Sequence, residues 1–340
     1  MIIILLILLA LTCIGLKKAD DQEVCLKKEH TDAIKGFFII IVFYSHILPY
    51  LTSSGVSFSP VWDIPANNVI KKIGQLMVVM FLFYSGYGVM ESIQRKGDSY
   101  IRAIPVKRVL SIFINYSIAI LVFLLMNSLL GIHYPFRQYL LSIIAWESVG
   151  QSNWYIFAII CCYISTYISF LLFKEKRIAF LATLLLLGVY ICLLHEFKEN
   201  WWYNIILSYP AGMMISLYKK NIMSFLEQRY ILCLSGLTLL FVLLFHYRNS
   251  TPTYLACAIT FAYLVFVISY KFVVKNAFLT WCGKNLFQIY VYQRIPMIAL
   301  SSLFPDFVRL HHYIYVLCCL AVTMLLAILI KPLSINLNNK

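Results

Sequence analysis

Long apolar runs separated by short polar segments extend over almost all of this 340-residue chain. An α-helix of about 20 apolar residues is long enough to cross the ~30 Å hydrocarbon core of a bilayer. A shorter run, 138–147, is expected to lie at the membrane interface or to re-enter. Runs of spanning or near-spanning length occur at eleven places: 2–16, 34–52, 73–93, 109–130, 152–173, 178–195, 202–218, 230–246, 253–270, 285–304 and 312–330.

The pattern predicts an all-α, polytopic membrane bundle. Charged residues make up 12% of the chain, whereas soluble domains carry about 25%. Run 2–16 lacks the basic start and the small-residue cleavage site of a signal peptide, so we expect an extra transmembrane helix there. The predicted organisation is an N-terminal helix and cytoplasmic linker at 1–33, a membrane domain at 34–332 and a cytoplasmic tail at 333–340. No repeat or long linker divides the membrane domain.

The net charge of +14 first suggests a nucleic-acid partner, but the basic residues lie between the apolar runs and form no stripe among stacking aromatics. Cytoplasmic loops of membrane proteins are enriched in Lys and Arg. With the N-terminus outside and the C-terminus in the cytoplasm, 21 of the 28 basic residues fall on the cytoplasmic side and six outside. The opposite orientation inverts this bias, so the first is predicted. It requires all eleven spans.

Most of the ten cysteines lie inside apolar runs, where they act as small hydrophobic residues. No Cys or His spacing is typical of a metal site, and no metal is expected.

One histidine is predicted near the middle of a span. His46 follows Lys35 by eleven residues, which places both side chains within about 20° of one another around the helix. Asp32 lies within about 40° of the same direction. Lys35 is then expected at the cytoplasmic rim, with His46 about 16 Å deeper. A buried histidine is either a passive hydrogen-bonding group or a proton acceptor, and imidazole exchanges protons near neutral pH.

Other polar residues suggest binding sites. Arg102, Lys107 and Arg108 follow span 73–93 on the cytoplasmic side, where they fit either the orientation rule or a phosphate-bearing ligand. Arg294 lies within span 285–304, where a charged guanidinium requires a partner or a cavity. On the outer side, a cluster at the start of span 152–173 could belong either to an aromatic belt at the membrane interface or to a sugar-binding site. Its members are Glu147, Asn153, Trp154 and Tyr155.

Several of these segments together resemble the acyltransferase-3 family of membrane O-acyltransferases over roughly residues 30–330. The family has a basic residue, usually Arg, ten residues before a His; here Lys35 precedes His46 at that spacing. Near Gln293 many members have a His, whereas this chain has Gln293-Arg294-Ile295-Pro296. The further matching segments, in the family's order, are Phe83-Tyr84-Ser85-Gly86-Tyr87-Gly88, the Arg102/Lys107/Arg108 loop, Asn153-Trp154-Tyr155 and Gly283-Lys284-Asn285-Leu286-Phe287-Gln288-Ile289-Tyr290.

The resemblance implies a ten-helix core and transfer of an acyl group, usually acetyl from cytosolic acetyl-CoA, to hydroxyls of cell-envelope carbohydrates. Lys35 and the basic loop would hold the phosphates of the donor, and His46 would act as general base. The expected location is the bacterial plasma membrane, and the expected partners are the bilayer, the acyl-CoA and the carbohydrate. As our own inference, Arg294 would stabilise the oxyanion.

Two other classes stay open on the sequence alone. In a proton-coupled transporter or flippase, His46 would relay protons and Arg294 would bind an anion. Transporters often show internal repeats, and none is visible here. A catalytically silent receptor or anchor could be built on the same bundle.

Overall fold

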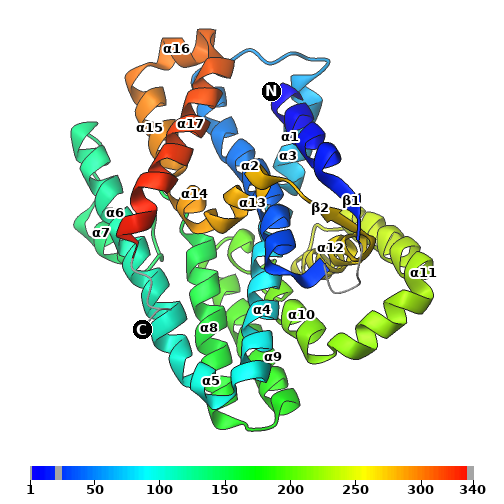
Figure 1. The fold of residues 1–340 in the computed structure, drawn as a ribbon. Helices are drawn as coiled ribbons and strands as arrows, with labels where there is room; N and C mark the ends of the chain where they lie inside the picture. Colours follow the sequence, from blue (N-terminus) through cyan, green and yellow to red (C-terminus); the bar gives the residue numbers. More distant parts are fainter. Residues whose placement is uncertain (1, 20–24, 335–340) are drawn as a thin grey trace.

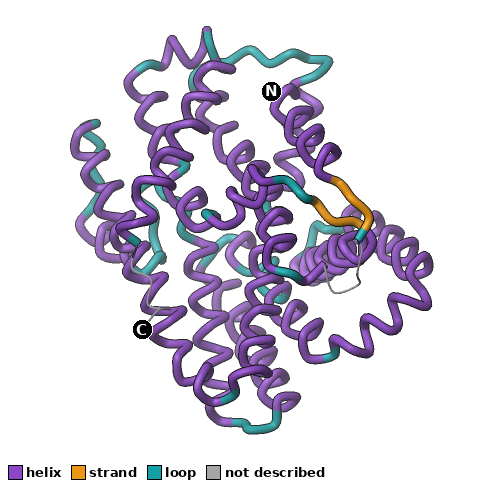
Figure 2. Tube along the Cα trace, in the orientation of Figure 1, coloured by secondary structure: helices purple, strands orange, loops and turns teal. Residues whose placement is uncertain are grey.

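The computed structural model describes residues 2–19 and 25–334, and these are almost entirely helical (Figures 1 and 2). Among these described residues, eight helical segments are long and apolar enough to span a membrane, and each coincides with a predicted run. They are α2 (Lys28–Ser53), α3 and α4 together (Asp63–Ile73 and Leu76–Lys96), α5 through α6 (Asp98–Ile104, a π-helical turn at Pro105–Leu110, and Ser111–Leu129), α8 (Trp154–Leu172), α9 (Lys176–Phe197), α11 (Lys219–His246), α12 (Thr251–Lys271) and α17 (His312–Ile330).

Two predicted spans are built from shorter helices. Run 202–218 contains only the ten-residue helix α10 (Ser208–Leu217), with Pro210 in its first turn, where a missing N–H costs no helical hydrogen bond. Run 285–304 is divided into α14 (Leu286–Tyr292) and α15 (Arg294–Leu303). Pro296 explains the division, because it cannot donate to the carbonyl of Tyr292 and its ring crowds that carbonyl.

The remaining helices are short. Run 138–147 forms α7 (Phe136–Ile143), while α13 (Ala277–Lys284) precedes α14 and α16 (Pro305–Leu310) follows α15.

The N-terminal run forms a helix, α1 (Ile2–Gly15), as predicted. A small antiparallel sheet follows it, in which β1 (Leu16–Lys18) pairs with β2 (Phe272–Val274). The side chain of Asn276 also donates to the carbonyl of Leu11 at 3.1 Å. These bonds place residues 16–18 and 272–274 side by side. Residue 1, part of the predicted linker (20–24) and most of the predicted tail (335–340) lie outside the described residues.

Glycines set the closest helix contacts in the bundle. Gly36 of α2 lies against the backbone of Leu279 in α13, and Gly283 of α13 lies against the backbone of Asp32. A Cβ atom at either glycine would overlap the opposing carbonyl group. Small residues allow this approach between membrane helices. The helix that carries His46 and the segment that leads to Arg294 are therefore locked together backbone to backbone.

Close glycine–backbone contacts of the same kind join α4 to α10. Gly86 lies against the carbonyl of Tyr209, and Gly212 lies against that of Phe83. In contrast, a Cβ atom at Gly88 would meet nothing within 4 Å. The Phe83–Gly88 segment thus has a packing role that accounts for Gly86.

Candidate active site

His46 lies in the interior of the bundle, on α2, and its ring is surrounded by protein. Its Nδ1 atom is buried and has no hydrogen-bond partner among the described residues, although the residue as a whole keeps partial exposure. This geometry does not match a passive histidine, which would satisfy its buried nitrogen with a neighbour.

Arg294 lies near His46 and directly follows the break between α14 and α15. It is the first residue of α15 and is close enough to act electrostatically on the His46 ring. Its Nε atom is buried without a hydrogen-bond partner, and no carboxylate in the described part of the chain pairs with it. Arg294 as a whole is half-buried, but a guanidinium at membrane depth without a counter-charge among the described residues is costly, so its position favours an anion or developing negative charge beside it.

Two tyrosines connect His46 to a cavity. The ring of Tyr290, on α14, lies 6.1 Å from that of His46, measured between centroids. Tyr155, at the start of α8, packs edge-on against Tyr290 at 5.1 Å. Arg294 also acts electrostatically on Tyr290. Both tyrosines line the same hollow, so Tyr290 forms a wall shared by the cavity and the His46 site.

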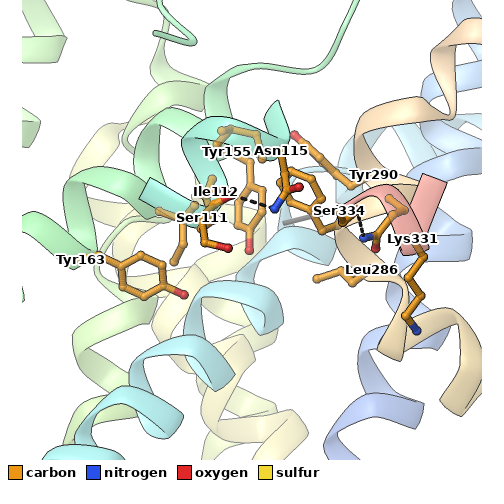
Figure 3. Close-up of a pocket in the computed structure, with 13 residues that line it drawn as sticks. Ser111, Ile112, Asn115, Tyr155, Tyr163, Leu286, Tyr290, Lys331 and Ser334 are labelled. Carbon is orange, nitrogen blue, oxygen red and sulfur yellow. Dashed lines mark hydrogen bonds between the residues drawn. The ribbon is translucent and has the colours of Figure 1, made fainter. Parts of the chain in front are cut away.

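The cavity has a volume of about 420 Å³ and lies between α6, α8, α14 and the end of α17 (Figure 3). Its lining mixes apolar side chains with amides, hydroxyls and one exposed cation, Lys331. Asn115 donates to the carbonyl of Ser111 at 2.8 Å, and Gln288 donates to the hydroxyl of Ser334 at 3.3 Å. The volume and the mixed lining of this cavity are typical of pockets that bind small molecules.

Arg108, one of the predicted phosphate-binding residues, acts on a side chain that lines this cavity. Its Nε atom donates to the hydroxyl of Tyr100 at 3.0 Å, and its charge acts on Tyr163, which lines the cavity. The residue is half-buried. It belongs to the π-helical turn Pro105–Leu110, where Pro105 lacks the N–H that an α-helix would direct to Ile101. Such turns are frequent at functional sites.

The other three predicted phosphate-binding cations have different surroundings. Arg102 is exposed on α5, and Lys107 is half-buried in the π-helical turn. Lys35 forms an ion pair with Asp32, in which Nζ lies 2.7 Å from Oδ1, and the Asp32 side chain is only 2% exposed. The spacing argument for a common helix face is thereby confirmed for these two residues. Their pairing also means that Lys35 presents a neutralised charge.

The structure distributes the predicted outer cluster over three environments. Asn153 donates to the carbonyl of Ala145 at 3.0 Å and orders the loop before α8. Glu147 lies 3.9 Å from the ammonium group of Lys198. Trp154 packs on Tyr155, and Tyr155 faces the cavity described above. The four residues therefore have different partners, and a role in sugar binding stays a prediction.

Several site residues were not predicted from the sequence, although Tyr290 belongs to one of the segments that carry the resemblance. Asn115, Tyr163 and Lys331 had no distinguishing pattern, because tyrosines, amides and terminal lysines are common in membrane helices. Only the packing of α6, α8 and α17 brings them together.

The fold and the site define a multi-pass membrane protein in which a histidine and an arginine lie near one another beside a ligand-sized cavity, each with a buried nitrogen that has no hydrogen-bond partner in the described part of the chain. The family model described as an acyltransferase domain matches residues 31–331. The chain therefore belongs to the acyltransferase-3 family, as the resemblance indicated. No curated protein and no solved structure matches it.

Proposed function

We propose that this protein transfers an acyl group, acetyl in the expected case, from cytosolic acetyl-CoA to a hydroxyl group of a cell-envelope polysaccharide or glycolipid. The observation that carries the proposal is the meeting of His46 and Arg294 in the interior, joined through Tyr290 to the 420 Å³ cavity. We further propose that the protein lies in a bacterial plasma membrane with its N-terminus outside and its C-terminus in the cytoplasm.

The reaction needs a base, an electrostatic partner for the oxyanion and a route for the donor. The acceptor oxygen attacks the thioester carbonyl carbon while His46 takes the hydroxyl proton. Negative charge then develops on the carbonyl oxygen, and the guanidinium of Arg294 stabilises it. When the intermediate collapses, the carbon–sulfur bond breaks and the proton passes from His46 to the departing CoA sulfur. The products are the ester and free CoA.

The cavity suits the narrow end of such a donor. The acyl-pantetheine arm would occupy the space between α6, α8 and α14, which ends at Tyr290 beside His46. The phosphates would stay near the cations Arg108 and Lys331. A guanidinium grips phosphate oxygens in pairs, which favours Arg108 as the main phosphate contact.

Replacing Arg108 by glutamine is expected to raise the KM for acetyl-CoA by about tenfold while kcat changes little, because a charge-assisted hydrogen bond to a bound ligand is worth ~1.5–3 kcal/mol. Arg102→Gln is expected to have a smaller effect, since its exposed charge is screened by solvent. Initial rates of CoA release over a range of acetyl-CoA concentrations measure both. Arg309→Gln, an exposed arginine on the predicted outer side, is the control. Equal KM values for Arg108→Gln and this control would remove Arg108 from the donor site.

The proposed activity itself is tested by adding acetyl-CoA with a labelled acetyl group to sealed membrane vesicles that contain the protein, and then isolating the glycan fraction. Base-labile label should enter the glycans only in vesicles with the protein. Movement of a glycan or anion across the vesicle membrane without esterification would instead favour the transporter.

A further inference from the structure

Two hollows of opposite character flank the corner where α10 turns into α11. The first has a volume of about 700 Å³ and is enclosed by the end of α4, the α8–α9 turn and the α10–α11 corner. Two carboxylates, Glu91 and Glu175, face five cations, so five minus two gives this lining a net charge of +3. The five cations are Lys174, Lys176, Arg177, Lys219 and Lys220.

The floor of this basic pocket is built by hydrogen bonds. The amide of Gln94 donates to the hydroxyl of Ser216 at 2.9 Å, and that hydroxyl donates to the carboxylate of Glu91 at 3.0 Å. Ser216 is buried. Glu91 therefore already has a donor on one of its oxygens, and the network joins α4 to α10 within the lining of this pocket.

The second hollow is an apolar groove of about 470 Å³ between α10, α11 and α12. At two places, consecutive residues of the chain line the groove and the basic pocket. Ile215 lines the groove and Ser216 lines the pocket; Ile222 lines the groove and Asn221 lines the pocket. Consecutive Cα atoms are 3.8 Å apart, so the two hollows approach one another closely at this corner.

We propose that this corner binds one anionic phospholipid, with its phosphate headgroup in the basic pocket and an acyl chain in the apolar groove. The orientation rule explains basic residues at helix ends, but it explains neither a hollow among them nor an adjoining apolar groove. Basic pockets between transmembrane helices bind anionic headgroups. No residue in the apolar part of α11 is fully buried by the rest of the described chain, and Phe225 and Leu232 in the groove are more than half exposed, so bilayer lipid reaches the groove directly. The proposal is independent of acyl transfer.

The test uses the full chain in detergent and compares retention of dioleoylphosphatidylglycerol with that of dioleoylphosphatidylcholine by native mass spectrometry. The acyl chains are identical, so preferential retention of the anionic lipid reports recognition of the headgroup. Lys176→Gln combined with Lys220→Gln should weaken binding about 30-fold, since each basic residue near an anionic lipid contributes ~1 kcal/mol. The control is Lys17→Gln combined with Lys18→Gln, which removes two exposed lysines at another surface.

A second variant tests the acyl chain. Gly236 lines the groove, and a Cβ atom there meets nothing within 4 Å, so Gly236→Phe fills the groove without a backbone clash. It should weaken phosphatidylglycerol binding about tenfold, because each buried CH₂ contributes ~0.8 kcal/mol. Gly188→Phe on α9, an equally open helical glycine outside both hollows, should not.

Equal retention of the two lipids would overturn the proposal. Phosphatidylglycerol binding that Gly236→Phe leaves intact, and that glycerol phosphate displaces, would show a site for free phosphate groups and would also overturn it.

Discussion

Replacing His46 by glutamine is expected to lower the rate of acetyl transfer by about 100- to 10,000-fold, the range that general-base catalysis contributes. Glutamine keeps a polar side chain of similar reach but cannot accept the hydroxyl proton. The ring of His46 lies beside Tyr290 and within the electrostatic reach of Arg294, and its Nδ1 atom has no competing partner within the described residues. The measurement is CoA release by the purified protein in the presence of the envelope glycan fraction.

The matched control is His246→Gln, which changes an exposed histidine at the end of α11. The two variants should unfold at similar temperatures in detergent. Among the described residues, the His46 side chain makes no hydrogen bond that the substitution would remove. Wild-type kcat in a folded His46→Gln protein would exclude the general-base role. Arg294 would then be the remaining catalytic candidate, with its charge as the only contribution.

The spans could be predicted from hydropathy wherever one helix crosses in a continuous apolar run, as in α2 and α17. Hydropathy was insufficient for 202–218 and 285–304, because apolar composition does not reveal where a proline ends one helix and permits the next. Pro296 was visible in the sequence, but its effect depends on whether neighbouring helices accommodate a break. That break gives Arg294 its position at the start of α15.

The sequence predicted the titratable and charged residues of the candidate site, but not the residues that line the cavity. His46 and Arg294 are unusual at membrane depth, and each was identified for that reason. Their proximity depends on the packing of α13 on α2, which no periodicity encodes. Glu147, Asn153 and Tyr155 are close in sequence but have different partners, and the chain between Glu147 and Asn153 passes through Gly150, which has a positive φ of 113°.

Replacing Gly36 by alanine is expected to destabilise the protein by about 3 kcal/mol or more, at or above the upper end of the usual cost of overpacking. The added Cβ atom would overlap the carbonyl group of Leu279, and backbone cannot move aside by changing rotamer. Separation of α13 from α2 would also displace α14 and, through it, Arg294 from His46. We therefore expect a lower unfolding temperature in detergent and loss of CoA release together.

Gly88→Ala provides the control, because its Cβ atom enters open space on α4. Alanine there should be neutral or stabilising by up to about 1 kcal/mol, since glycine weakens a helix interior by ~0.5–1 kcal/mol relative to alanine. The two substitutions add the same methyl group to helices of the same bundle, so opposite signs isolate the backbone contact as the cause. If Gly36→Ala proved as stable and active as Gly88→Ala, α2 and α13 would have to lie farther apart than described. The alignment of His46 with Arg294, which depends on that contact, would then lose its structural basis.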